Sequence, residues 1–419
     1  MSHPHHHGGS RPRGDSRSRA AERRLRQRVV WLLTAALVPV VAALVIGAVV
    51  LWPHHTLDTA SLGGLTGDAK GTTYVAARTD QVKPFDCQSV GSGPGIKVKC
   101  AHITVTLTSG PDKGKHQTFD VDPTVLKSGM QPGDELRLAR FRAVGGLPAS
   151  YAFVDFARSN TLIGLAVVFA ILVVVIARVR GLAALIGLAL SFVVLIKFMI
   201  PALLAGESAL AVAVVGCAAI MFVLLYLAHG ISIRTTTALI GTLFGLGASA
   251  LLGTWAVAAT HLTGAGNEDN MTLTAVAGHV HLPGLMLAGV IVASLGILND
   301  VTVTQASAVW ELRAVSPDAS PGRLFSGAMR IGRDHIASTV YTIVFAYAGA
   351  ALPVLLLINL SQRPLGAILT GEAIGEELVR TLVGAIGLVL SVPLTTAVGV
   401  ALVRFARGSK ESPAVPVAP

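Results

Sequence analysis

The stretch LPGLMLAGVIVASLGILNDVTVTQASAVWEL, residues 282–312, decides how the rest of the chain is interpreted. Its first part is apolar enough to enter a lipid bilayer. On a helix, Asp300, Thr304, Ser307 and Glu311 are spaced by four, three and four residues, so these polar side chains share one face. The pattern predicts a membrane-spanning helix that ends in an acidic polar stripe. Such a stripe favours a site for water, an ion or a small polar solute.

The composition places the whole chain among integral membrane proteins. Of its 419 residues, 52% are hydrophobic and only 13% are charged, whereas soluble domains carry about 25% charged residues. The net charge of +10 comes from basic residues beside apolar runs, where they act as topology signals and attract anionic lipids. Because no basic patch alternates with aromatic residues, we expect no nucleic-acid partner. The lipid bilayer is the expected environment.

Long apolar runs predict about eight transmembrane helices in an all-α polytopic membrane protein. We interpret the first run as a retained anchor, because it exceeds a signal-peptide core and no clear small-residue cleavage site follows it. A cleaved signal peptide is the alternative. The expected spans are 29–51, 161–178, 182–203, 208–228, 236–261, 281–300, 337–360 and 380–404.

The distribution of charge gives the expected orientation. Links predicted to be cytoplasmic are rich in arginine, whereas the opposite links are mostly acidic, as the positive-inside rule requires. We therefore expect both termini to lie in the cytoplasm and the large polar segment to lie outside it. The predicted organisation is a disordered basic tail (1–28), an anchor helix (29–51), an extracytoplasmic β-rich domain (52–159), a seven-helix membrane domain (160–405) and a cytoplasmic tail (406–419).

The only sizeable polar part of the sequence is predicted to form a small β domain. The segments TTYVAA, IKVKCAHITVTL and DELRLARF alternate apolar and polar residues and are separated by glycine-rich turns. They predict an antiparallel barrel or sandwich, OB-like in type. Cys87 and Cys100 lie here and either form a disulfide or remain two unpaired thiols. Cys217, in an apolar run, is expected to be a small buried packing residue.

Asp300 is the strongest functional candidate, because a charged side chain within a bilayer is costly. It could bind a cation, relay a proton or pair with an arginine. In the alternative interpretation, Asn299 and Asp300 mark the membrane interface or cap a second, cytoplasmic helix. Glu311 lies about 16 Å further along the helix, where we expect a solvated surface acid.

A second polar group is predicted on the same side of the membrane as Asp300. Arg333, Asp334 and His335 are expected to open the next span, where they either bind an anion, transfer a proton or anchor the interface. His229 ends an earlier span on that side. Our hypothesis is that one inward-facing polar vestibule is lined by His229, Asp300, Thr304, Asp334 and His335.

Secondary candidates lie near the opposite ends of the spans. Lys197 either snorkels to the interface or pairs with an acid such as Glu376 or Glu377. These two acids either attract cations at the outer rim or belong to a capped helix start. Gly241 and Gly245 form a GxxxG pair that favours close helix packing in lipid.

Four blocks of this sequence resemble a known family. They are LAHGISIRTTTALIGT from Leu227, GVIVASLGILNDVTVTQASAVWEL from Gly289, AMRIGRDHIASTVYTIVFAYAGAALPVLLL from Ala328 and GEELVRTLVGAIGLVLSVPLTT from Gly375. Together they resemble the YibE/F-like family of multi-pass bacterial membrane proteins over residues 160–405. The resemblance implies a bacterial cell membrane location and a permease role with no settled substrate. It supplies no catalytic residues.

Transport of an unidentified ion or small polar solute is therefore the first expected function. The alternative is a non-transporting scaffold, receptor or assembly factor that acts through the β domain on a protein partner or a second copy of the chain. We do not expect an enzyme, because HExxH, GxSxG and paired membrane aspartates are absent from the sequence. A Walker A motif is also absent, and neither a cofactor nor a metal site is predicted.

Overall fold

The computed structural model describes residues 31, 34–35, 37–53, 72–88, 97–143, 148–266, 268–278, 280–360 and 364–403. The chain divides into two compact units, a β unit (Asp58–Ile176) and a helical unit (Met1–Leu57 with Ala177–Pro419). The predicted tails, 1–28 and 406–419, lie outside the described residues.

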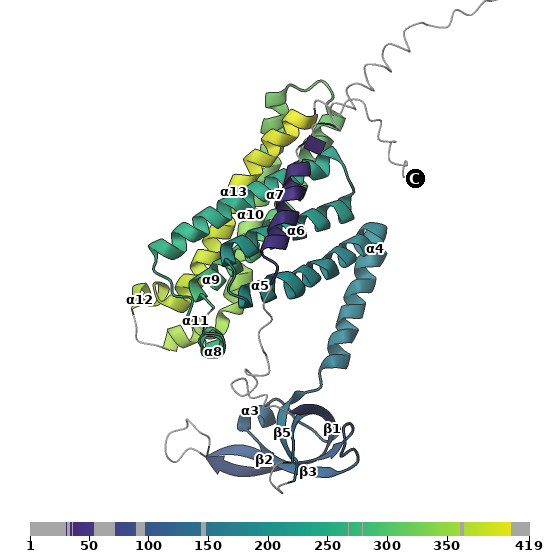
Figure 1. Cartoon of the computed structure of the whole chain (residues 1–419), viewed down its shortest axis with the longest axis vertical. Coiled ribbons are helices and arrows are strands. Elements are labelled where there is room, and N and C mark those ends of the chain that lie inside the picture. Colours follow the sequence, from purple (N-terminus) through teal and green to yellow (C-terminus); the bar gives the residue numbers. More distant parts are fainter. Residues whose placement is uncertain are drawn as a thin grey trace, which may run out of the picture. The chain divides into compact units, whose positions relative to one another are not determined.

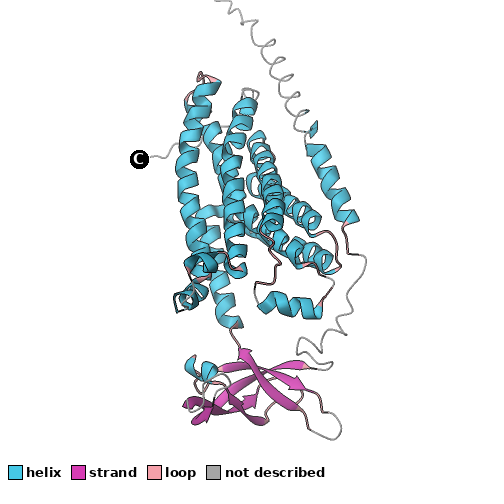
Figure 2. Ribbon diagram, turned by 90° about the vertical axis from the view of Figure 1, so that its left-hand side faces the viewer, coloured by secondary structure: helices cyan, strands magenta, loops and turns pink. Residues whose placement is uncertain are grey.

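The β unit is one curled antiparallel sheet (Figures 1 and 2). Its strands are ordered β3-β2-β1-β4-β5. A short helix, α3 (Pro123–Lys127), lies between β3 and β4. The separate antiparallel sheet expected from the alternating segments is thus confirmed. The strand bounds are β1 Thr73–Gln88, β2 Lys97–Leu107, β3 His116–Val121, β4 Glu135–Phe141 and β5 Ser150–Phe156.

Alternation along β2 builds the core of this unit. Ala101, Ile103, Val105 and Leu107 point inward and are almost fully buried, as the two-residue period of a strand requires. The intervening side chains face outward. Cys87 on β1 and Cys100 on β2 are joined by a disulfide, so the two longest strands are also linked covalently.

A polar cluster fixes one edge of the β unit around Asp112. Its carboxylate accepts hydrogen bonds from Lys115 at 2.8 Å, Tyr151 at 2.5 Å and Arg140 at 3.1 Å. These three hydrogen bonds hold the pKa of Asp112 well below its ordinary value of 3.8, and the bond from Lys115 has the largest effect. The cluster ties the β2–β3 turn to strands β4 and β5.

The helical unit consists of long apolar helices and short connecting ones (Figure 1). In the described part of the chain, five helices are long and apolar enough to cross a membrane, or six when a bent pair counts as one span. The elements are α4 Ser159–Val194, η1 Leu195–Met199, α5 Ile200–Leu204, α6 Ala209–His229, α7 Ile233–Ala259, α8 Glu268–Val276, α9 Leu282–Val315, α10 Pro321–Ala350, α11 Leu352–Leu360, α12 Leu365–Leu369 and α13 Glu372–Val403.

The difference from eight expected spans lies in how broken helices are counted. The two spans expected at 161–178 and 182–203 fall in one element, 159–204, with non-helical backbone at Arg178 (φ 54°, ψ −133°). The expected anchor 29–51 contains a described apolar helix, Leu37–Val50, which is shorter than a full span. The number of eight therefore stays a prediction.

Two helices extend well beyond their expected bounds. The span placed at 281–300 continues as one helix to Val315, and the span placed at 337–360 begins at Pro321. Ser320 caps the latter helix by accepting a hydrogen bond from the Arg323 N–H, and Pro321 suits the first helical position. Hydropathy marks only the part of a helix that fits the bilayer, so it misses these polar extensions.

Helices α7 and α13 pack antiparallel through small residues that alternate across the interface. Gly241 faces Thr395, Gly245 faces Ser391, and Gly387 faces Ser249. At each level one partner has no side chain, so the hydroxyl of the other fills the space. The predicted role of Gly241 and Gly245 in close packing is confirmed.

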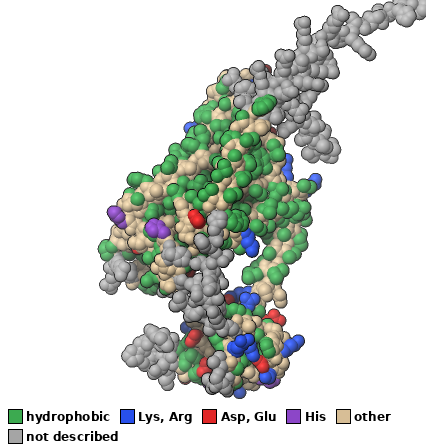
Figure 3. Space-filling model, viewed as in Figure 1, with side chains coloured by type: hydrophobic (Ala, Val, Ile, Leu, Met, Phe, Trp, Pro, Cys, Tyr) green, Lys and Arg blue, Asp and Glu red, His purple; other side chains and the backbone are tan. Residues whose placement is uncertain are grey.

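The outside of the helical unit is apolar. Figure 3 shows hydrophobic side chains spread over its visible face. Val179 and Leu360 are each 80% exposed. Apolar surface of this extent is unfavourable in water but suits contact with lipid.

Candidate functional site

The residues of the predicted stripe on α9 differ in how far they are exposed to the surroundings. Asp300 has a side chain 69% exposed, and Glu311 is also exposed. Thr304 donates its hydroxyl to the Asp300 carbonyl oxygen at 2.8 Å, within its own helix. Ser307 is partly buried.

Asp300 is paired with His335, which connects α9 to α10. The Asp300 Oδ2 and His335 Nε2 atoms are 3.4 Å apart, close enough for an ion pair but without hydrogen-bond geometry. Beside them, the buried Oδ1 of Asn299 has no hydrogen-bond partner among the described residues. At this place α9 therefore contributes the Asp300 carboxylate and the unpaired Asn299 oxygen, and α10 contributes the His335 imidazole.

Two expectations about these residues are wrong. Arg333, Asp334 and His335 do not open a helix, because α10 begins twelve residues before Arg333. Asn299 and Asp300 do not cap a second helix, because α9 continues through them without interruption to Val315. Asp334 and Arg333 are exposed, and the Arg333 Nε donates to the Met329 carbonyl oxygen.

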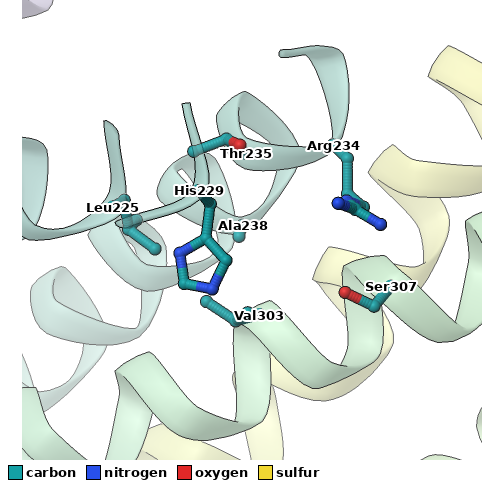
Figure 4. Close-up of a pocket in the computed structure, with 7 residues that line it drawn as sticks. All are labelled: Leu225, His229, Arg234, Thr235, Ala238, Val303 and Ser307. Carbon is teal, nitrogen blue, oxygen red and sulfur yellow. The ribbon is translucent and has the colours of Figure 1, made fainter. Parts of the chain in front are cut away.

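His229 and Ser307 meet at a different place, in a small pocket between α6, α7 and α9 (Figure 4). The other polar lining residues are Arg234 and Thr235 at the start of α7. The space open to the centre of a water molecule is about 10 Å³, roughly the room for one water. Among the described residues, no hydrogen bond or ion pair joins the lining of this pocket to the side chains of Asp300 and His335. The vestibule residues thus lie in two groups.

A buried polar seam runs beside the stripe and was not predicted. The Thr302 and Thr242 hydroxyls are 2.6 Å apart and connect α9 to α7. The Gln305 amide donates to the Ala328 carbonyl oxygen at 2.9 Å and to the Thr396 hydroxyl at 2.6 Å. Thr302 and Gln305 are both almost fully buried. The sequence feature that could have indicated this seam is the spacing of three residues between Thr302 and Gln305, which puts two polar side chains on one otherwise apolar side of the helix.

At the opposite end of the bundle, acids of α13 hold the loop that follows α7. Glu372 accepts hydrogen bonds from the Thr263 N–H and hydroxyl, and Glu376 accepts one from the Gly266 N–H at 3.1 Å. Glu377 forms an ion pair with Arg380 at 2.9 Å. Glu376 and Glu377 lie near the start of α13, which begins at Glu372, as the interpretation of a helix start expects.

Lys197 is exposed in the π-helical segment η1, and it has no ion pair with a described residue. Pro201 follows this segment, and a proline is a known cause of such local irregularity because it lacks an N–H. Cys217 is fully buried among apolar side chains. Within the described residues, no three His, Cys, Asp or Glu side chains are grouped to hold a metal ion.

Comparison with known proteins agrees with this architecture. The sequence model of the family described as "YibE/F-like protein" matches residues 165–405. No curated protein and no solved structure matches the chain. The match covers more than half of the 419 residues, including α6, α7, α9, α10 and α13, which carry the stripe, the pocket and the seam. The chain therefore belongs to the YibE/F-like family.

Proposed function

We propose that the chain is a permease for an ion or small polar solute, with Asp300 and His335 at its site. The observation that carries this proposal is the 3.4 Å pairing of the two side chains between two membrane-type helices. A charge on a membrane helix costs roughly 2.5–3.5 kcal/mol at its centre. A carboxylate and an imidazole side by side can exchange a proton or share a cation. Such a role would explain why a costly charged residue is present on a membrane helix.

The depth of the pair supports a site at one membrane boundary. Asp300 lies eighteen residues beyond Leu282, about 27 Å along the helix axis. The hydrocarbon core of a bilayer is about 30 Å thick. If α9 enters the membrane near Leu282, the pair lies at the far edge of the core, where a solute can enter from water.

The broken span formed by α10 and α11 supports movement at this site. The two helices are bent by 65°, and Pro353 stands just after the break. Discontinuous helices commonly form the substrate sites of transporters. Beyond His335, α10 has one buried side chain, Ile343, whereas α7, α9 and α13 are locked together by small residues. We propose that α10 moves against this fixed group and carries His335 with it.

A vesicle flux assay tests the permease. The full chain is reconstituted into liposomes that contain a pH-sensitive dye, and the collapse of an imposed gradient of protons, sodium or potassium is followed. We expect faster collapse than in protein-free vesicles. Asp300→Asn and His335→Gln should each reduce the rate at least tenfold, whereas Glu311→Gln, an exposed acid on the same stripe, should not. Flux equal to that of empty vesicles, or unaffected by Asp300→Asn, would contradict the proposal.

A second candidate function rests on the β unit. Its strand order, the helix between β3 and β4, and the proximity of β3 to β5 support an OB-like barrel. An open polar pocket of about 400 Å³ is lined by residues that include Asp134, Glu135 and Arg158. In this alternative the chain is a scaffold or receptor that binds a protein partner or a second copy through this unit.

Photo-crosslinking distinguishes the alternative from transport. A photoreactive residue at Glu135 of the full chain should capture a specific partner in intact cells, and Asp300→Asn should not change the capture. The same group at Lys113, exposed on the β2–β3 turn, serves as the control position. Equal labelling from both positions would argue against a partner at this pocket.

The proposed location is the bacterial cytoplasmic membrane, with both termini in the cytoplasm and the β unit outside. The arginines at the end of α9 and in the first half of α10 support this orientation; they are Arg313, Arg323, Arg330 and Arg333. Because Cys217 is buried and the other two cysteines are bonded, single cysteines can report topology. An impermeant thiol reagent should label Lys113→Cys on intact spheroplasts and Ser316→Cys only after permeabilisation. The reverse pattern would invert the orientation.

A further inference from the structure

The pocket between α6, α7 and α9 has two basic lining residues and no acidic one. Arg234 and His229 line it, and the positive charge of Arg180 on α4 also acts on the His229 ring. Among the described residues, neither arginine forms an ion pair or a side-chain hydrogen bond. Arg234 is only partly exposed. Among the described residues, the positive charge of Arg234 therefore has no counter-charge, and an anion bound in the pocket would supply one.

The pocket also offers hydroxyl groups. Figure 4 shows the Arg234 guanidinium and the Ser307 hydroxyl on the same side of the pocket, with the His229 ring beside them above Val303. The hydroxyl of Thr235 completes the polar lining, and it is already 2.9 Å from the Ser232 hydroxyl. The donors come from three helices, so an anion bound here would contact all of them at once.

We infer that this pocket binds a phosphate-bearing anion, independently of the Asp300–His335 site. A guanidinium is suited to bidentate contact with phosphate oxygens. The enclosed space, about 10 Å³ for the centre of a water molecule, admits one oxygen-sized group. The remaining phosphate oxygens would stay at the mouth beside Arg234 and His229.

Two sources share this chemistry, a lipid headgroup and a free phosphate compound. Basic pockets between transmembrane helices on the cytoplasmic side are known to take lipid headgroups. The pocket lies where α6 ends and α7 begins, at the end of the bundle that also contains Arg313 in the last turn of α9 and Arg323 near the start of α10. A lipid phosphate and a soluble phosphate can both reach this position.

The test measures the thermal unfolding of the purified full chain in zwitterionic detergent. Inorganic phosphate is titrated at constant ionic strength against chloride, and the second arm compares vesicles of phosphatidylcholine with vesicles containing phosphatidic acid. We expect a rise in the unfolding midpoint in one arm or both. Arg234→Gln should weaken the apparent affinity at least tenfold, Arg234→Lys should weaken it less, and Arg330→Gln, an exposed arginine on α10, should leave it unchanged.

The outcomes separate the sources and the alternatives. A shift with inorganic phosphate that Arg234→Gln removes assigns a free phosphate ligand, whereas a shift confined to phosphatidic acid assigns a headgroup. Equal loss in Arg234→Gln and Arg330→Gln would reveal general charge attraction and overturn the inference. The absence of any shift in the natural chain would also overturn it. Asp300→Asn should respond like the natural chain, so failure of the permease proposal would not affect this result.

Discussion

At the scale of single residues, close packing of α7 depends on the missing side chain of Gly245. An alanine Cβ at this position would overlap the Ser391 hydroxyl on α13 and the Leu298 side chain on α9. Overpacking of this kind costs about 1–3 kcal/mol. We expect Gly245→Ala to lower the free energy of unfolding by that amount, measured by denaturation in mixed detergent micelles.

Gly247 is the matched control, two residues further along the same helix. A Cβ there would meet nothing within 4 Å, and alanine is favoured over glycine in a helix by about 1 kcal/mol. Gly247→Ala should therefore leave stability unchanged or raise it slightly. Equal destabilisation by the two substitutions would show that helix propensity, rather than the α7–α13 contact, decides the effect.

Asp112 gives the β unit a predictable acid sensitivity. Because its pKa is lowered in the folded protein, its contribution is complete above the ordinary pKa of 3.8 and is lost as the pH falls below that value. Asp112→Asn should destabilise the β unit at pH 6, and the difference from the natural chain should shrink as the pH falls towards 2.

The measurement is amide hydrogen exchange over β2 and β3 in the full chain at several pH values, corrected for the intrinsic exchange rate. Asp86→Asn provides the control, since Asp86 pairs only with the exposed Lys99 at 3.5 Å. A difference between Asp112→Asn and the natural chain that stays constant from pH 6 to pH 2 would contradict the proposed linkage.

At the scale of helices and strands, the sequence predicts element type better than element length. The apolar periods of α6 and α7 gave bounds within three residues of the observed ones, because most of each helix is apolar. The start of α13 was placed eight residues late, because its first turns are acidic. The spacing of the polar residues from Asp300 to Glu311 indicated that α9 continues beyond its apolar part, but the first half of α10 was missed. Its helical structure depends on the cap at Ser320 and on packing between elements, neither of which contributes to hydropathy.

The candidate site was predicted in part for a related reason. Helical spacing correctly placed Asp300 and Ser307 on one face, but their partners depend on the rotation and tilt of neighbouring helices. Asp300 meets His335, and Ser307 meets the pocket that contains His229. The sequence predicts how deep a residue lies in the membrane. It does not predict which neighbouring helix the side chain of that residue contacts.

Gln305 is the polar contact that joins three elements, so its removal should loosen one of them. Gln305→Met keeps similar volume but removes the hydrogen bonds to the Ala328 carbonyl and the Thr396 hydroxyl. Interhelical hydrogen bonds in membranes contribute about 0.6–1.7 kcal/mol. We expect faster hydrogen exchange over residues 321–335 of α10 and little change in α7.

Ser326→Ala tests whether any polar loss on α10 has this effect. Its hydroxyl is exposed and bonds only to the Arg323 carbonyl oxygen within the same helix. Exchange over 321–335 should then match the natural chain. If Gln305→Met behaves in the same way, α10 is held by its apolar contacts, such as Leu324 and Ala328, and the polar seam does not fix its position.

At the scale of the whole molecule, the two units are stabilised by different forces. The β unit has a small apolar core with a disulfide and an ion cluster around Asp112. The helical unit has an apolar exterior, and inside it small and hydroxyl-bearing residues pack beside large apolar ones. In lipid there is little hydrophobic force between helices, so close packing and hydrogen bonds replace it. The two units should therefore respond differently to the same perturbation.

Reduction of the disulfide is such a perturbation. Cys87 and Cys100 are separated by thirteen residues, and a cross-link across a loop of this size stabilises by about 3 kcal/mol. We expect a reductant, or Cys87→Ser with Cys100→Ser, to increase proteolysis and hydrogen exchange throughout β1 to β5 while α7, α9 and α13 stay protected. Cys217→Ala, which alters a buried residue of the helical unit, should affect only the helices around it. Loss of protection in both units after reduction would show that they fold as one cooperative body, and the separate treatment of their stabilities would then be wrong.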